Sequence, residues 1–181
     1  MPEPTDADRY PTGRFAYDDA PGARAAAIAA IASLPSDLRA ALDGLSDAAL
    51  DTPYRDGGWT ARQVARHIAD SHMNALVRVK RALTEEAPLV TPYAQDPWVR
   101  LPDASLPLDV PLALLDALHA QWSALLAALP DADFARGYVH PEHGRLVPIE
   151  EATQMYAWHG RHHLAHIAAA VARHAVETGG R

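Results

Sequence analysis

Eight residues near the C-terminal end, His159-Gly160-Arg161-His162-His163-Leu164-Ala165-His166, contain four of the ten histidines of this 181-residue chain. The stretch lies in a segment with the apolar spacing of a helix. Imidazoles four residues apart on a helix lie one above the other, with Cβ atoms about 5–6 Å apart, so two ring nitrogens can reach one divalent ion. His159 with His163 and His162 with His166 both have this spacing. The stretch predicts a helix that carries half of a metal site.

A solvated histidine-rich face and a proton-handling site are the alternatives to a metal site. At 100° per residue, one face of this helix holds three of the histidines together with apolar residues, and His162 lies at its edge. The histidines therefore point toward the expected core, which disfavours the solvated face and mildly favours the first pair. An ion also removes the cost of burying unpartnered imidazoles, about 1–3 kcal/mol each. The face consists of Ala152, Met155, Tyr156, His159, His163, His166 and Ala170.

The rest of the chain has an all-α pattern, rich in Ala and Leu, with Pro and Gly clustered between periodic segments. A four-helix bundle is the simplest arrangement, since such bundles build metal sites in their core from facing helices. We expect an N-terminal arm over 1–20, mostly extended, and a single bundle domain over 21–178. The predicted helices are 22–34, followed after an interruption at Pro35-Ser36 by a short helix over 37–42, then 60–84, 110–129, and 148 to just before Gly179.

Two long connections separate these helices. The segment 85–108 contains five prolines, which forbid a helix, and predicts a long crossover between the second and third main helices. The segment 131–148 is expected to be a loop, and it contains His140-Pro141-Glu142-His143-Gly144. A rim element that places His140 or Glu142 over the metal is one hypothesis for this loop, and a polar surface turn is the other.

The second main helix offers further ligands. Thr60 followed by Gln63 is a capping-box start, and His67 and His72 flank the inward stripe of this helix on opposite sides. Either histidine is placed to supply a third ligand, and spacing alone favours His67 over His72. Three protein ligands with one open position are typical of catalytic zinc sites. Asp70 and Glu142 are candidate carboxylates to orient the ligands, although solvated carboxylates are common.

Composition excludes several classes of protein. The net charge of -7 disfavours nucleic acid and an anionic membrane surface as partners. The absence of cysteine leaves only nitrogen and oxygen donors for a metal. Without an apolar N-terminal segment, we expect a cytoplasmic protein with no membrane partner.

Several motifs, in order along the chain, resemble the YfiT subgroup of the DinB-like superfamily. They are Tyr54 to Gln63 (YRDGGWTARQ), His67 to Asn74 (HIADSHMN), Ala82 to Glu85 (ALTE), His140 to Glu142 (HPE) and Tyr156 to Ile167 (YAWHGRHHLAHI). The match runs from about Ala20 to Val171. It does not extend to the first twenty residues, and nothing is carried onto them.

The resemblance implies a four-helix bundle that binds one zinc or nickel ion per subunit through one histidine of the second helix and an i, i+4 pair on the fourth. Carried over by position, these ligands are His67, His159 and His163, and His166 becomes a pocket or supporting residue. The subgroup is described as metal-dependent hydrolases that form homodimers. Relatives in the wider superfamily transfer low-molecular-weight thiols, such as bacillithiol or mycothiol, to electrophiles.

We therefore expect a metalloenzyme that acts on a small molecule by activating a water or a thiol. Asp70, Glu142 and His166 are its candidate catalytic residues. A thiol S-transferase is the close alternative to a hydrolase. A non-catalytic, metal-stabilised binding bundle is the alternative from another class, and a closed fourth position would favour it.

Overall fold

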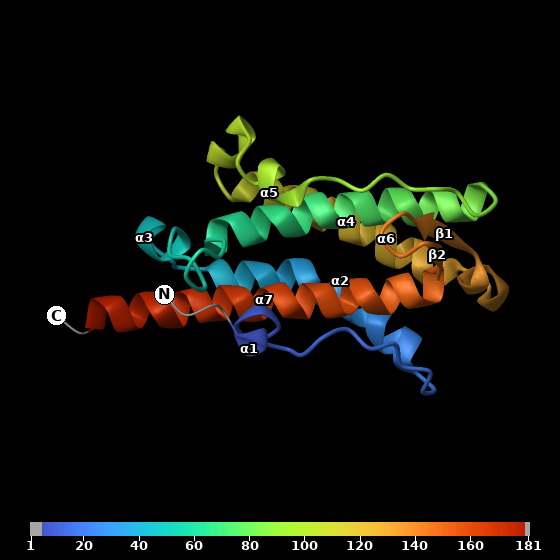
Figure 1. Cartoon of the computed structure of the whole chain (residues 1–181), viewed down its shortest axis with the longest axis horizontal. Helices are drawn as coiled ribbons and strands as arrows, with labels where there is room; N and C mark the ends of the chain where they lie inside the picture. The colour runs from blue at the N-terminus through green and yellow to red at the C-terminus, as the bar shows by residue number, and fades with distance from the viewer. Residues whose placement is uncertain (1–4, 180–181) are drawn as a thin grey trace.

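The computed structural model describes residues 5–179 and has four long helices, which confirms the all-α four-helix bundle (Figure 1). Shorter helical turns and one hairpin of antiparallel strands join them. The long helices are α2 (Ala23–Leu42), α4 (Ala61–Thr84), α6 (Asp109–Ala128) and α7 (Ile149–Gly179). The short elements are α1 (Asp6–Arg9), α3 (Asp47–Leu50), α5 (Gln95–Trp98), η1 (Pro102–Ser105), η2 (Asp131–Ala135), β1 (Gly137–His140) and β2 (Arg145–Pro148).

The four long helices surround one core, and α2 and α4 each pack against both α6 and α7. Arg24 near the start of α2 pairs with Glu150 near the start of α7, and Leu34 further along α2 packs against Gly160 further along α7. These two helices are therefore parallel. The crossover after α4 runs back along that helix (Figure 1), so α6 starts at the same end as α4. This topology brings α4 antiparallel to α7, the helix that carries the four clustered histidines.

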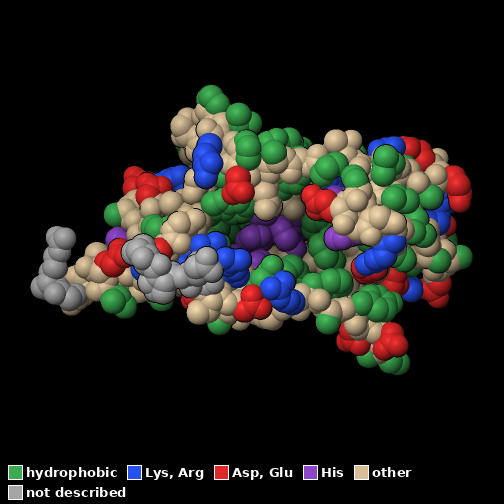
Figure 2. All heavy atoms as spheres, in the orientation of Figure 1, with side chains coloured by type: hydrophobic (Ala, Val, Ile, Leu, Met, Phe, Trp, Pro, Cys, Tyr) green, Lys and Arg blue, Asp and Glu red, His purple; other side chains and the backbone are tan. Residues whose placement is uncertain are grey.

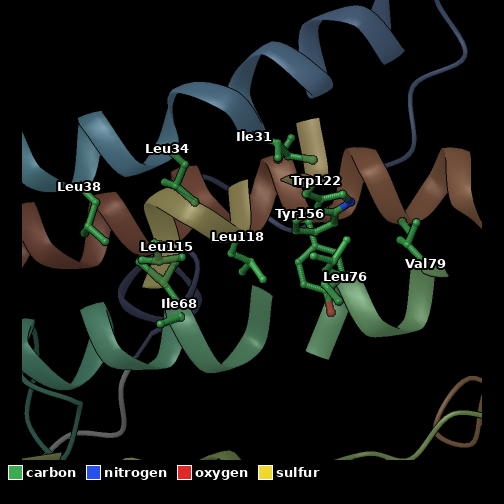
Figure 3. Close-up of a cluster of buried hydrophobic side chains, with 14 of the residues drawn as sticks. Ile31, Leu34, Leu38, Ile68, Leu76, Val79, Leu115, Leu118, Trp122 and Tyr156 are labelled. Carbon is green, nitrogen blue, oxygen red and sulfur yellow. The ribbon is translucent and has the colours of Figure 1, made fainter. Parts of the chain in front are cut away.

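The face of the molecule shown in Figure 2 is hollowed near its middle, and histidine side chains line the floor of the hollow. Below it, large apolar side chains from all four helices fill the core (Figure 3). Ile31, Ile68, Leu115 and Trp122 are completely buried. Gly160 lets α2 and α7 approach closely, because a Cβ atom there would lie 2.9 Å from Leu34 Cδ2. The hollow therefore lies over a densely packed core.

The start of α4 confirms the predicted capping box. Thr60 Oγ1 accepts a hydrogen bond from the Gln63 backbone N–H at 3.2 Å, and Gln63 Oε1 accepts one from the Thr60 N–H at 3.0 Å. These bonds satisfy backbone donors that have no partner inside the helix. They fix the helical phase of His67, two turns further along.

The predicted interruption at Pro35-Ser36 is wrong. Helix α2 continues through Pro35 without a break. A proline inside a helix has no N–H to donate to the carbonyl four residues earlier, here that of Ile31. His119 Nδ1 donates to this carbonyl at 2.5 Å instead. A side chain on α6 thus replaces the missing helical bond, and the buried Pro35 remains part of the helix.

The connections are more ordered than expected. The segment predicted as a loop over 131–148 contains η2 and the hairpin of β1 with β2. The crossover includes α5 and η1, and it is tied to β1 by Val90 N–H to Val139 O at 3.0 Å. In the N-terminal arm, the described residues have no regular secondary structure apart from the single turn of α1 and the turns around it. They lie along α7, where Trp158 Nε1 donates to Gly13 O at 3.0 Å.

Two long helices, α2 and α6, are apolar and long enough by composition to cross a membrane. Both supply buried side chains to the core, which also accounts for an apolar composition. The division into an arm over 1–20 and a domain over 21–178 stays a prediction.

Candidate metal centre

Three histidines meet in a pocket between α4 and α7. His67 on α4 faces His159 and His163 on α7, and one ring nitrogen from each lies within 4.8 Å of the others. The Nε2 atoms of His67 and His159 are 3.3 Å apart. His67 and His163 are buried, whereas His159 keeps partial contact with solvent. We call these three residues the primary triad.

The interior of the bundle keeps the primary triad neutral. Burial lowers the pKa of His67 to about 4, against a smaller opposing effect of the Asp96 charge. Burial also holds the pKa of His159 and His163 well below the ordinary value. A neutral imidazole has a free lone pair on one nitrogen, and this is the form that binds a metal.

A chain of histidines leads from the primary triad to the Ile31 carbonyl. His72 Nε2 lies 3.0 Å from His159 Nδ1, and His72 Nδ1 lies 3.0 Å from His119 Nε2. The carbonyl accepts only, so His119 must carry its proton on Nδ1. His72 then donates from Nδ1 and His159 donates from Nδ1. The chain leaves the lone pair of His159 on Nε2, which faces His67.

The other two members of the primary triad also have partners at their second nitrogen. His67 Nδ1 lies 3.5 Å from the Tyr93 hydroxyl, a long contact. His163 Nδ1 lies 3.3 Å from His166 Nδ1, which leaves His163 Nε2 for the triad. Ligand histidines are usually held in this way by a group on the far side of the ring. His166 therefore lies where a supporting residue is expected.

A second set of three histidines overlaps the first. His162, His163 and His166 also bring ring nitrogens within 4.8 Å of one another. All three come from α7, and His162 Nδ1 and His166 Nε2 are buried with no hydrogen-bond partner in the described part of the chain. Tyr54 stacks on His166 with ring centroids 4.0 Å apart. We call this group the secondary triad.

The geometry of the primary triad fits a divalent metal. Zinc–nitrogen bonds of 2.0–2.1 Å in a tetrahedral site place ligand atoms about 3.3–3.4 Å apart. The separation of 3.3 Å between the Nε2 atoms of His67 and His159 matches this edge. The primary triad contains three imidazoles, and the chain has no cysteine to close the site with a thiolate. Three neutral nitrogen donors suit zinc and nickel alike.

Sequence reasoning missed several residues around the triad. Trp59 packs against the site, with its ring centroid 4.6 Å from that of His67. Asp96 accepts a hydrogen bond from Trp59 Nε1 at 3.0 Å. His119 belongs to a helix on which the sequence analysis placed no site residue. Only its lone polar ring among the apolar residues of that helix could have pointed to it.

The predicted carboxylates lie elsewhere. Asp70 is half-buried, and among the described residues no hydrogen bond or ion pair joins its carboxylate to a histidine; burial raises its pKa. Glu142 is exposed at the end of the hairpin, 3.9 Å from His140 Nδ1. His140 and His143 line a neighbouring pocket and not the triad itself. Imidazoles and a tyrosine, in place of carboxylates, contact the far nitrogens of the primary triad.

Comparisons with known proteins agree on the family. Residues 30–167 match the model of the DinB superfamily. A protein of Bacillus mycoides named "Putative metal-dependent hydrolase" is 47% identical over 161 residues, covering 88% of this chain and 92% of the relative. A protein of the same description from Bacillus cereus strain B4264 has the same identity and coverage.

The fold also matches a solved structure from Bacillus subtilis. That structure is described as "YfiT from Bacillus subtilis is a probable metal-dependent hydrolase with an unusual four-helix bundle topology". It superposes with a TM-score of 0.87 at 39% identity, covering 96% of this chain and 98% of the other. Sequence, fold and the histidine cluster lead to one conclusion: the chain belongs to the DinB superfamily, close to YfiT.

Proposed function

We propose that this protein is a hydrolase that uses one divalent metal, zinc or nickel, held by His67, His159 and His163. The observation that carries the proposal is the primary triad, with three neutral imidazoles from two helices and a partner at each far nitrogen. The names of the relatives point in the same direction. Such an ion acts as a Lewis acid, which polarises a carbonyl and lowers the pKa of a water or thiol toward neutrality.

The residues of the chain prepare the site for that chemistry. His72 and His119 hold the His159 ring with its Nε2 lone pair toward the triad. Trp59 and Tyr54 form aromatic walls beside His67 and His166, which limit the access of bulk water. In hydrolysis, the water oxygen bonds to the acyl carbon, and the leaving group departs with a proton. Tyr93, whose pKa burial raises to about 12, stays protonated near neutral pH and can donate a hydrogen bond.

The open position of the site favours catalysis over a purely structural role. The primary triad has three members among the described residues, and structural zinc sites usually have four protein ligands. The triad also borders a pocket lined by Trp59, Gln95 and Asp96. Transfer of a thiol to an electrophile would use the same ion and the same open position. We therefore treat thiol transfer as an outcome of the test.

The first experiment measures metal. Purified protein is expected to hold one equivalent of zinc or nickel, and His163→Ala is expected to lose it. His174→Ala is the matched control, because His174 lies on the same helix but bonds Thr52 and not the triad. Bound metal that is unchanged in His163→Ala would show that the assignment is wrong.

The second experiment measures activity. An ester and amide panel runs beside a thiol-transfer panel with added zinc or nickel. Hydrolysis that is abolished by a chelator and restored by the ion supports the proposal. Activity confined to the thiol panel replaces it with an S-transferase, and no activity in either panel leaves the non-catalytic binding bundle. From the family resemblance we also propose a cytoplasmic homodimer, which sedimentation and cell fractionation would check.

A further inference from the structure

A second pocket lies beside the metal centre, between α4, the hairpin and the crossover. It has a volume of about 680 Å³ and includes Arg78, Tyr138, His140 and Tyr156 in its lining. Gln95 and Asp96 line both this pocket and the one over the primary triad. Figure 2 shows more histidine surface further along the same face, beyond the central hollow. The two pockets are therefore neighbours on one face.

Arg78 is a buried cation for which the described residues supply no counter-charge. Its side chain is only 9% exposed, and among the described residues no carboxylate lies within 4 Å of it. Its Nη1 donates to the Tyr156 hydroxyl at 3.4 Å and its Nη2 donates to the Thr91 carbonyl at 3.1 Å. A guanidinium has five N–H groups, so several remain for another partner. Burying an unpaired charge costs several kcal/mol, which a bound anion would offset.

The other charges of the pocket do not neutralise Arg78. Glu151 is already paired with Arg145, through contacts of 2.6 and 2.8 Å. Glu142 lies at the exposed rim, and its nearest cationic candidate is His140. Burial, with the charge of Arg78, lowers the pKa of His140 and keeps it neutral. Asp96, the other carboxylate of the lining, is exposed and accepts a hydrogen bond from Trp59 Nε1. Among the described residues, Arg78 is therefore a buried positive charge that no carboxylate contacts, beside buried tyrosine side chains.

The geometry points to Arg78 as the binding site for a substrate carboxylate. One unpaired cation matches one negative charge, and the guanidinium fork suits the two oxygens of a carboxylate. Arg78 follows His67 by eleven residues on α4, so their Cα atoms are about 16 Å apart. Since the arginine side chain leans back toward the start of its helix, the substrate spans on the order of 10 Å.

The substrate is thus a slender molecule with a carboxylate at one end and the reacting bond at the other. This inference rests on the proposed function only for the position of the reacting bond. The anion site itself stands on Arg78, its burial and its free donors. Binding can therefore be tested without the ion and without turnover.

The test measures binding to metal-free protein, so that a carboxylate cannot bind the ion instead. Adipate monoamide, which carries one charge, is compared with the neutral adipamide by calorimetry. We expect the wild type to prefer the charged ligand, and Arg78→Gln to lose at least about tenfold in affinity for it alone. Lys80→Gln is the control, since it removes an exposed charge from the same helix. A folded Arg78→Gln variant that keeps the preference overturns the proposal.

A measurement on the wild type covers the case in which Arg78→Gln fails to fold. In ¹⁵N-arginine spectra, adipate monoamide is expected to shift the Nε resonance of Arg78, which Arg78→Lys assigns by its disappearance. Adipamide is expected to leave that resonance in place. An Arg78 resonance that responds to neither ligand, or equally to both, overturns the site.

Ester substrates separate this site from the proposed function. Monomethyl adipate and methyl hexanoate are offered to the metal-loaded enzyme. If carboxylate binding depends on Arg78 but neither ester is hydrolysed, the anion site is supported and the proposed hydrolase is not. Equal hydrolysis of both esters, with no carboxylate preference in binding, overturns the anion site and leaves the hydrolase.

Discussion

The primary and secondary triads share His163 and satisfy the same distance criterion, yet they differ in what surrounds them. The primary triad joins two helices, and each of its far nitrogens has a partner. The secondary triad comes from one helix and contains two buried nitrogens that no described residue hydrogen-bonds. Proximity of imidazoles is therefore common to both, and what sets the primary triad apart is a partner at the far nitrogen of every ring. A hydrogen-bond partner at the far nitrogen of each ring, more than the distance between the rings, distinguishes a set of metal ligands from a mere cluster of histidines.

The largest difference between the two triads is expected when one residue is removed from each. His159→Ala is expected to reduce bound zinc or nickel from one equivalent to a trace after dialysis, because two imidazoles rarely hold such an ion. His162→Ala is expected to keep the full equivalent. Elemental analysis of both variants measures the result. The reverse pattern would place the ion in the secondary triad.

Lowering the pH of the metal-free protein tests whether its buried imidazoles are neutral. The pKa of His67 falls from 6.5 to about 4 on folding, so the unfolded chain takes up the proton first as pH decreases. The stability that neutral His67 contributes is therefore fully present above pH 6.5 and is lost between about 6.5 and 4. This histidine alone accounts for about 3 kcal/mol of the loss.

Urea unfolding between pH 7.5 and 4.5 with a chelator measures this effect. His67→Gln is the comparison, since glutamine does not titrate in this range. Its free energy of unfolding is expected to fall less steeply with acid than that of the wild type. Parallel curves for the two proteins would contradict a buried neutral His67.

A smaller effect is expected when the chain of histidines is cut. His119→Ala leaves His72 without its acceptor and frees the His159 ring to change tautomer. Metal affinity is expected to fall about 10- to 100-fold in competition with a chelator. In ¹⁵N-histidine spectra, the wild type is expected to show His159 protonated on Nδ1. A His119→Ala variant with unchanged affinity and an unchanged tautomer would show that the chain only fills space.

The smallest effect concerns Pro35. Pro35→Ala supplies an N–H that competes with His119 for the Ile31 carbonyl. We expect metal binding to weaken only about two- to fivefold, because the histidine chain keeps its other contacts. Ser36→Ala, the next residue along α2, is the control. Equal affinity in both variants would show that the missing helical bond plays no part in the site.

Much of the fold follows from local pattern. The capping box at Thr60 and the long apolar periods gave helix limits within a residue or two of α4, α6 and α7. Local pattern did not predict the continuous helix through Pro35 or the hairpin over β1 and β2. Both depend on partners far away in sequence, namely His119 for Ile31 and the crossover residues Pro88 and Val90 for Val139. Local propensity contains no information about such partners.

For the candidate site, the sequence by itself determined that His159 and His163 share a helix face, because the 3.6-residue period fixes that geometry. It favoured His67 over His72 as a third ligand but left both as candidates, since a helical wheel gives no rotation of one helix relative to another. The tertiary structure placed His67 in the primary triad and His72 behind His159. It also decided that Arg78 has no carboxylate partner among residues 5–179. These contacts depend on how the helices pack against one another, which the spacing of residues within one helix does not determine.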